Sequence, residues 1–359
     1  MKSTRPLAVL AVAIVLLSAT IGCIRPRNEG TPNEIARRLL DYLVAEDFGA
    51  AFAMFDKTMQ ALLPQAQLAS VWGDLVKQFG PYADEIEISE EYGGKFARIV
   101  IRSLFARGAL DIKVTVNARR EVAGLFFSPA QGYGYKEPAY VDRSRFVEED
   151  VVLNAGGSFP LPGTLSLPVG NGPWPAVLLV HGSGPNDRDE TIMANKPFAD
   201  IAWALSSRGI AVLRYDKRTF AHAAAMAKLA NITLQEETVD DAVAGARFLL
   251  GDPRIDAARV YVLGHSLGGM AAPRIGARLP DLAGLILLAA PARPLEDIML
   301  EQYGYIFGLE SDPEKHAAQL TQLRAQAERV KDPQLTTDTP ASDLLGIPAA
   351  YWLDLRGYS

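Results

Sequence analysis

The sequence predicts an α/β fold with a doubly wound, mostly parallel sheet, preceded by a small α+β domain. Three observations lead to this prediction. Between residues 33 and 127 the hydrophobic period is first helical and then alternates every second residue. From residue 146 onward, strand patterns alternate with helix patterns, as in a parallel sheet. A strand also runs directly into Gly-x-Ser-x-Gly at residues 264–268 and then into a helix.

Length and composition limit the possible classes of protein. The 359 residues suffice for two domains, and 49% hydrophobic with 22% charged residues indicates a globular chain. A net charge of −6 and a pI near 5.4 argue against a nucleic-acid partner. The single cysteine, Cys23, excludes an intrachain disulfide and a cysteine-rich metal site.

Residues 1–23 are predicted to be an export leader. A basic start is followed by an apolar run over residues 7–17 and then by small residues. The Gly-Cys pair that ends at Cys23 resembles the cleavage box of bacterial lipoproteins, which makes Cys23 the expected lipid anchor; Thr20 stands where leucine is usual. A plain signal peptide or an uncleaved anchor are the alternatives. In each case we expect an exported body that meets the membrane through this leader or its lipid.

Residues 31–128 are predicted to form the α+β domain. Helices are expected from residue 33 and over 48–63 and 68–79, followed by strands at 85–91, 96–105, 109–116 and 121–127. This order resembles a cystatin-like or NTF2-like module of some exported bacterial proteins. The segment has no histidine, and its acidic residues are scattered along solvated faces. We therefore interpret it as a spacer or a binding module.

Residues 129–144, rich in Gly, Pro and Tyr, are predicted to be a linker to a second domain over 145–359. The patterns at 146–153 and 161–167 predict an antiparallel pair at a sheet edge. Short apolar runs predict buried strands at residues 176–180, 210–215, 260–263 and 285–289. Helices are expected between them at 198–208 and 234–250.

Ser266 is the predicted nucleophile. A sharp turn between a strand and a helix gives such a serine a strained backbone that exposes its Oγ, and glycines flank it because a Cβ there would strike neighbouring backbone. The alternative is an ordinary serine in a connecting loop.

Oxyanion donors are predicted on either side of the nucleophile. The backbone N–H of Leu267 lies at a helix N-terminus, where negative charge is favoured. The loop after the strand at 176–180 reads His-Gly-Ser-Gly-Pro, so we expect the second donor to be the N–H of Ser183, with Gly182 as the next choice. His181 is expected to hold this loop by a ring hydrogen bond, and His265 is expected to be structural.

Together these motifs resemble the serine α/β-hydrolases over residues 145–359. They are most similar to the bacterial esterase D-like family, which overlaps in sequence with the S9 and S33 peptidase groups. The likeness is carried by residues 181–189, 214–218, 264–269 and 289–294. It implies hydrolysis of a small-molecule carboxylic ester through an acyl-enzyme, without a metal or an organic cofactor. It also implies a helical cap over the site at about residues 295–335.

The chain departs from this family pattern after the nucleophile. The family's acid and histidine follow on loops after later strands, but His316 is the one histidine after Ser266, and no buried-strand pattern follows Pro291. His222 is no better placed. The missing strands need roughly 60–90 residues. We therefore expect a truncated hydrolase domain that is inactive as given. The alternatives are an exported, tethered binding protein with a vestigial hydrolase domain, and a serine peptidase of the same fold.

Overall fold

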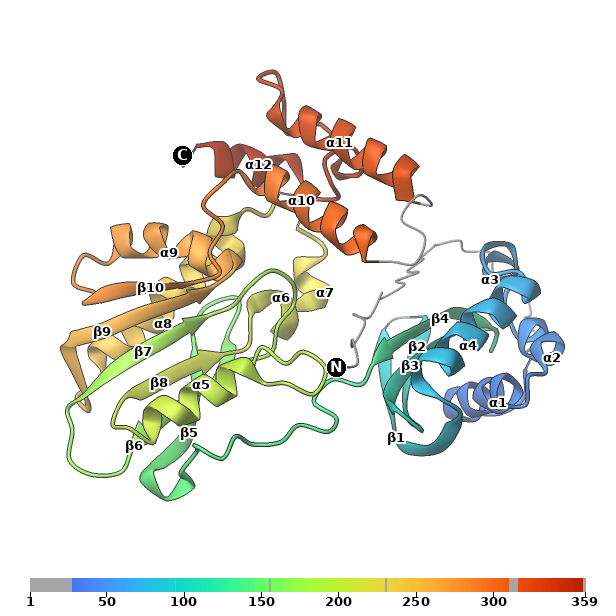
Figure 1. The fold of residues 1–359 in the computed structure, drawn as a ribbon, viewed down its shortest axis with the longest axis horizontal. Coiled ribbons are helices and arrows are strands. Elements are labelled where there is room, and N and C mark those ends of the chain that lie inside the picture. Colours follow the sequence, from blue (N-terminus) through green and yellow to red (C-terminus); the bar gives the residue numbers. More distant parts are fainter. Residues whose placement is uncertain (1–27, 94, 155, 230, 310–315, 358–359) are drawn as a thin grey trace. The chain divides into compact units, whose positions relative to one another are not determined.

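The computed structural model describes residues 28–93, 95–154, 156–229, 231–309 and 316–357 (Figure 1). They divide into two compact units between Gly134 and Tyr135, a point that lies inside the linker predicted at 129–144. The predicted leader, with Cys23, lies outside the described residues. Within the described part of the chain, no helix has both the length and the apolar character that crossing a membrane requires.

The N-terminal unit is the predicted α+β domain. Its antiparallel sheet has the strand order β1-β2-β3-β4. The elements are α1 (Pro32–Val44), α2 (Phe48–Ala53), α3 (Lys57–Leu62), α4 (Gln65–Phe79), β1 (Tyr82–Gly93), β2 (Phe96–Phe105), β3 (Gly108–Asn117) and β4 (Val122–Pro129). Fully buried side chains of α1, such as Leu39, share one core with Ile99 and Ile112 of the sheet. The helices therefore cover one face of the sheet.

The helix predicted at 48–63 is in fact two helices, α2 and α3. Phe55 is fully buried and forms an isolated parallel bridge with Val122. Asp56 then begins α3 as its N-cap, because its Oδ1 accepts the Met59 N–H at 2.8 Å. Hydrophobic periodicity alone missed this break, since the buried Phe55 fits both a continuous helix and the bridge.

The C-terminal unit contains the predicted doubly wound sheet, with the strand order β10-β9-β7-β8-β6-β5 (Figure 1). The first four of these strands are parallel, whereas β6 and β5 run antiparallel at one edge as expected. The strands are β5 (Phe146–Leu153), β6 (Leu161–Pro168), β7 (Trp174–Val180), β8 (Ala211–Tyr215), β9 (Ile255–His265) and β10 (Gly284–Leu288).

Helices cover both faces of this sheet. In β7, Leu178 packs with the core under α8 (Asp240–Gly251) and α9 (Leu267–Arg278). The next residue, Leu179, packs with α5 (Pro197–Ser206) on the opposite face. Successive side chains of a strand point to opposite faces, so an uninterrupted apolar run is what a strand buried on both faces needs. Short helices lie in the connections: η1 (Arg143–Arg145), α6 (Arg218–Ala221), α7 (Ala223–Met226) and the π-helix η2 (Gln235–Val239).

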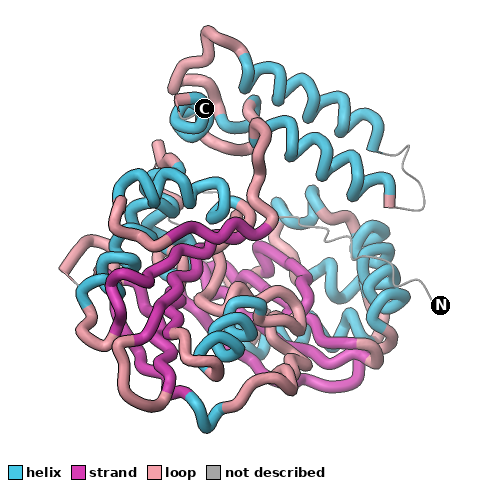
Figure 2. Tube along the Cα trace, turned by 60° about the vertical axis from the view of Figure 1, so that its left-hand side comes forward, coloured by secondary structure: helices cyan, strands magenta, loops and turns pink. Residues whose placement is uncertain are grey.

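Helices follow β10 and form a small core of their own. They are α10 (Leu295–Gly308), α11 (Ala317–Lys331), η4 (Ala341–Asp343) and α12 (Ala349–Arg356). Helices α10 and α11 lie side by side (Figure 2). Val330, Leu344 and Trp352 are buried together. The helical section thus runs past residue 335, the predicted end of the cap.

Strand β10 leaves an unusual apolar surface. Its residues 285–288 are leucine or isoleucine with exposed fractions between 37% and 51%. The strand pairs with β9 along one edge, and no other described strand pairs with it. Parallel strands are ordinarily buried on both faces. Within the described residues, therefore, the sheet ends at β10 in an open hydrophobic edge.

Candidate active site

The turn between β9 and α9 has the predicted strained geometry. Ser266 has φ 51° and ψ −115°, a left-handed conformation that a residue with a Cβ rarely adopts. Its N–H donates to the Leu288 carbonyl at 2.8 Å, which fixes the turn against β10. The flanking glycines are required by space: a Cβ on Gly264 would lie 2.2 Å from the Gly268 oxygen, and one on Gly268 would lie 2.3 Å from the Val180 oxygen.

The loop after β7 packs directly against this turn. A Cβ added to Gly182 would lie 3.3 Å from the Cβ of Ser266, so the two backbones are in close contact. The Asn186 side-chain amide folds the loop by donating to the Gly182 carbonyl at 3.2 Å and the Ser183 carbonyl at 3.1 Å. The loop therefore has a defined conformation beside Ser266.

The three candidate oxyanion donors differ in their present partners. The N–H of Gly182 donates to Glu190 Oε1 at 2.7 Å. Within the described residues, the N–H groups of Ser183 and Leu267 make no hydrogen bond. Two of the predicted donors thus have no hydrogen-bond partner among the described residues, whereas Gly182 is engaged.

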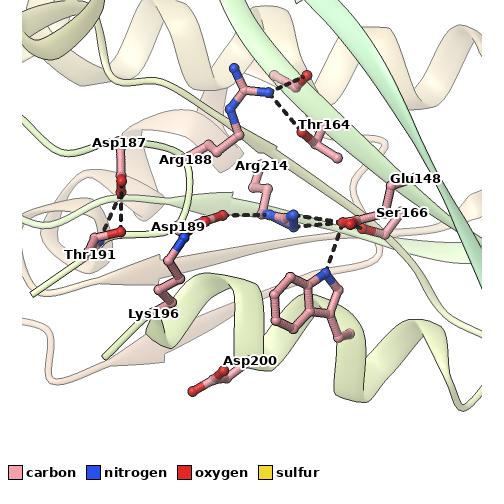
Figure 3. Close-up of polar contacts among 12 residues, drawn as sticks. Glu148, Thr164, Ser166, Asp187, Arg188, Asp189, Thr191, Lys196, Asp200 and Arg214 are labelled. Carbon is pink, nitrogen blue, oxygen red and sulfur yellow. Dashed lines mark hydrogen bonds and ion pairs between the residues drawn. The ribbon is translucent and has the colours of Figure 1, made fainter. Parts of the chain in front are cut away.

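Charged side chains of the loop pair with Arg214 of β8, as Figure 3 shows for Asp189, and with Asp216, the first residue after β8. The backbone N–H and the guanidinium of Arg188 bind Asp216 at 2.9–3.1 Å. Asp189 binds the guanidinium of Arg214, which is 5% exposed, at 3.1 Å. Arg214 also reaches Glu148 of β5 at 2.7 Å. The sequence motifs at 181–189 and 214–218 are therefore joined by two ion pairs, Arg188–Asp216 and Asp189–Arg214, which we call the clasp.

Two more charged side chains hold Gly182 itself. Glu190, on the N–H side, also lies 2.9 Å from Nδ1 of His265, next to the nucleophile. Lys217, on the carbonyl side, donates to the Gly182 oxygen at 2.9 Å and to Glu237 of η2 at 2.6 Å. Sequence reasoning missed the roles of Glu190 and Lys217. Their position in loops after parallel strands was the available signal, because the carboxyl ends of such strands meet at one edge of the sheet.

His181 is a packing residue beneath the loop. Its ring contacts Phe198 and Tyr215, with centroid distances of 5.1 and 5.2 Å. Burial, aided by the charge of Lys217, lowers the pKa of His181 to about 3. Neither ring nitrogen has a hydrogen bond of normal geometry within the described residues, but a contact with the backbone of Asp187 in the same loop opposes the fall in pKa. The ring hydrogen bond that would hold the loop stays a prediction.

The other histidines have separate surroundings. His222 Nε2 lies 2.8 Å from the Pro160 carbonyl oxygen. His316 stacks on Phe307 in the helical section, with ring centroids 4.1 Å apart. His265 pairs with Glu190. None of the described histidines is therefore hydrogen-bonded to Ser266.

A strained serine turn at the carboxyl edge of a doubly wound sheet, beside a glycine-rich loop, is the arrangement typical of the α/β-hydrolases. Residues 177–357 match the model of the alpha/beta hydrolase family, and the chain belongs to that family. Residues 36–125 match a second model, described as a protein of unknown function, DUF3887.

The chain is also similar to individual proteins. It is 38% identical over 329 residues to esterase EstD of Thermotoga maritima, an alignment that covers 91% of this chain and 75% of that protein. Among solved structures it resembles the alpha/beta hydrolase GrgF of Penicillium sp. sh18, with a TM-score of 0.34, 16% identity, and coverage of 59% of this chain and 64% of that one. For dipeptidyl peptidase 4 of Porphyromonas gingivalis the TM-score is 0.32 at 16% identity, with coverage of 56% and 28%. The chain thus spans less than two thirds of either solved structure.

Proposed function

We propose that this protein hydrolyses a small-molecule carboxylic ester through an acyl-enzyme on Ser266. The observation that carries the proposal is the strained Ser266 turn beside two free backbone donors, Ser183 and Leu267. The 38% identity to esterase EstD supports an ester as the substrate. No step of the proposed reaction uses a metal or an organic cofactor.

In the proposed reaction, Ser266 Oγ attacks the carbonyl carbon of the ester while a base removes the hydroxyl proton. The carbonyl oxygen becomes an oxyanion between the N–H groups of Ser183 and Leu267, and the N-terminus of α9 adds a favourable dipole. The alcohol leaves with the proton, and water then releases the acid by the reverse sequence. Both donors belong to backbone that is already fixed, so no reorganisation is needed.

The base is proposed to lie outside the described residues, because none of the described histidines is hydrogen-bonded to Ser266. His181 is buried with a pKa of about 3. His265 is the residue before Ser266, and its Nδ1 lies 2.9 Å from Glu190 rather than at the serine. We propose that the acid and histidine belong to a further segment that covers the exposed edge of β10. The 359-residue chain would then keep only the contributions of the oxyanion hole and of binding.

Two alternatives from the sequence remain open as proposals. One is an exported, tethered binding protein, with residues 31–128 as the binding module; it predicts that this segment folds alone and binds a ligand. The other is a serine peptidase, which a panel of ester and amide substrates would distinguish. For export itself, we propose lipidation at Cys23, and Cys23→Ser should abolish incorporation of labelled palmitate.

Hydrolysis of p-nitrophenyl acetate tests the main proposal. The 359-residue chain should act several orders of magnitude more slowly than ordinary esterases. A form extended by the native downstream sequence should reach ordinary esterase rates and lose them in Ser266→Ala, but not in the exposed control Ser158→Ala. Ordinary esterase rates from the 359-residue chain would refute the proposal that this chain lacks the catalytic base. Activity that survives Ser266→Ala would refute Ser266 as the nucleophile.

A further inference from the structure

The peptide unit between Gly182 and Ser183 is held from its carbonyl side by a buried cation. Lys217 Nζ donates to the Gly182 oxygen at 2.9 Å, and the lysine side chain is 3% exposed. This peptide unit is trans, so its carbonyl and the Ser183 N–H point in opposite directions. The cation on the carbonyl therefore sets the direction of the Ser183 N–H.

Glycine makes such an anchor necessary. Gly182 has no Cβ, and its backbone has more freedom to rotate than that of other residues. Glu190 fixes the preceding peptide unit by accepting the Gly182 N–H at 2.7 Å. Asn186 adds a weaker bond to the Gly182 carbonyl at 3.2 Å. With Glu190 on one side and Lys217 on the other, rotation of either peptide unit would break a bond to a buried ion.

We propose that Lys217 is a positioning residue for ester hydrolysis, which aims the Ser183 N–H at the oxyanion without touching the substrate. A positive charge at the carbonyl also polarises the peptide unit and strengthens its N–H as a donor. This inference rests on the proposed function of Ser266.

The surroundings of Lys217 are those of a fixed charge. Glu237 Oε1 lies 2.6 Å from its ammonium and balances it, as a buried cation requires. Tyr351 of α12 contacts Glu237 in turn, and burial together with the charge of Glu237 raises the pKa of that phenol. The chain of contacts therefore runs from the helical section after β10 to the candidate oxyanion donor.

A variant that tests the role of Lys217 must not leave a buried charge without its partner. Lys217→Met alone would leave Glu237 without its partner and could unfold the protein, so the test variant is Lys217→Met/Glu237→Gln. The probe is phenylboronic acid, whose tetrahedral adduct with a serine hydroxyl places an oxygen where the oxyanion would lie. Its binding does not depend on turnover.

We expect the double variant Lys217→Met/Glu237→Gln, called the neutral pair because it lacks both charges, to bind phenylboronic acid at least tenfold more weakly than the unchanged protein. Lys217→Arg keeps a cation and should therefore bind phenylboronic acid more tightly than the neutral pair, even if it unfolds at a lower temperature. If Lys217 had only a structural role, the affinity of each variant would instead follow its midpoint of thermal unfolding. Lys331→Met is the control, because the ion pairs of Lys331 are with Asp297 and Glu328.

Two results would overturn the inference. Binding by the neutral pair within twofold of the unchanged protein would show that Lys217 does not position the donor. If Ser266→Ala bound phenylboronic acid as tightly as the unchanged protein, the proposed nucleophile would itself be wrong, and this inference would fall with it.

Discussion

Glu190 accepts the backbone N–H of Gly182, with 2.7 Å between that nitrogen and Oε1. The same oxygen lies 2.9 Å from Nδ1 of His265, so one buried carboxylate joins the loop after β7 to the turn that presents Ser266. This contact engages Gly182 and leaves Ser183 and Leu267 as the free pair of donors. The site is thus arranged in part by a charged side chain that joins two loops.

The lack of space around Gly264, at the turn that presents Ser266, predicts that even a methyl group there will strongly destabilise the fold. Gly264→Ala would place a Cβ 2.2 Å from the Gly268 oxygen, a contact that only a backbone shift can relieve. We expect a loss of at least about 3 kcal/mol in the free energy of unfolding, measured with urea. Gly304→Ala in α10 is the control: it meets no heavy atom within 4 Å and should stabilise by roughly 0.5–1 kcal/mol. Equal effects of the two substitutions would contradict the steric argument.

The clasp between the two motifs predicts energetic coupling of Arg188 and Asp216. Their side chains are 24% and 14% exposed, and the pair has several hydrogen bonds. A double-mutant cycle with alanine at both positions should give a coupling energy of roughly 1–3 kcal/mol. The exposed pair Arg259 and Asp256 serves as the control and should give less than about 0.5 kcal/mol. The clasp would be disproved by a coupling no larger than that of the control.

Burial of His181 predicts acid sensitivity. Its pKa is about 3 in the folded protein, against an ordinary value of 6.5, so the unfolded state binds the proton more readily. This contribution to stability is complete above pH 6.5 and is lost as the pH falls toward 3, at up to about 1.4 kcal/mol per pH unit. His181→Phe should reduce the slope of unfolding free energy between pH 7 and 5. An unchanged slope would show that His181 is not the group responsible.

The open edge of β10 predicts self-association of the 359-residue chain. Leu287 is 51% exposed on this edge, and Leu287→Lys places a charge there. We expect less concentration-dependent association of this variant in sedimentation velocity. The control is Val152→Lys on β5, at the opposite edge of the sheet, where the exposed fraction is 50%. If only Val152→Lys reduced association, the hydrophobic edge of β10 would not be its cause.

Local patterns were enough to predict most of the architecture. The alternation of strands and helices from residue 146 predicted the mostly parallel sheet, and Gly-x-Ser-x-Gly after a strand predicted the strained turn at Ser266. These features depend on a few neighbouring residues, because side-chain period and steric exclusion at glycine act over short distances. The break at Phe55 escaped prediction, because its partner Val122 is distant in sequence.

What the sequence by itself determined was the class of fold, the serine turn and the loop that accompanies it. Only the tertiary structure decided which loop donor is engaged and which are free, since Glu190 and Lys217 reach Gly182 from segments whose relative positions depend on the whole sheet. The sequence places Glu190 and Lys217 in loops that follow strands, but it does not show which groups they contact. Parallel strands bring distant loops to one edge, and there the electrostatic pairs form after the sheet has set their distances.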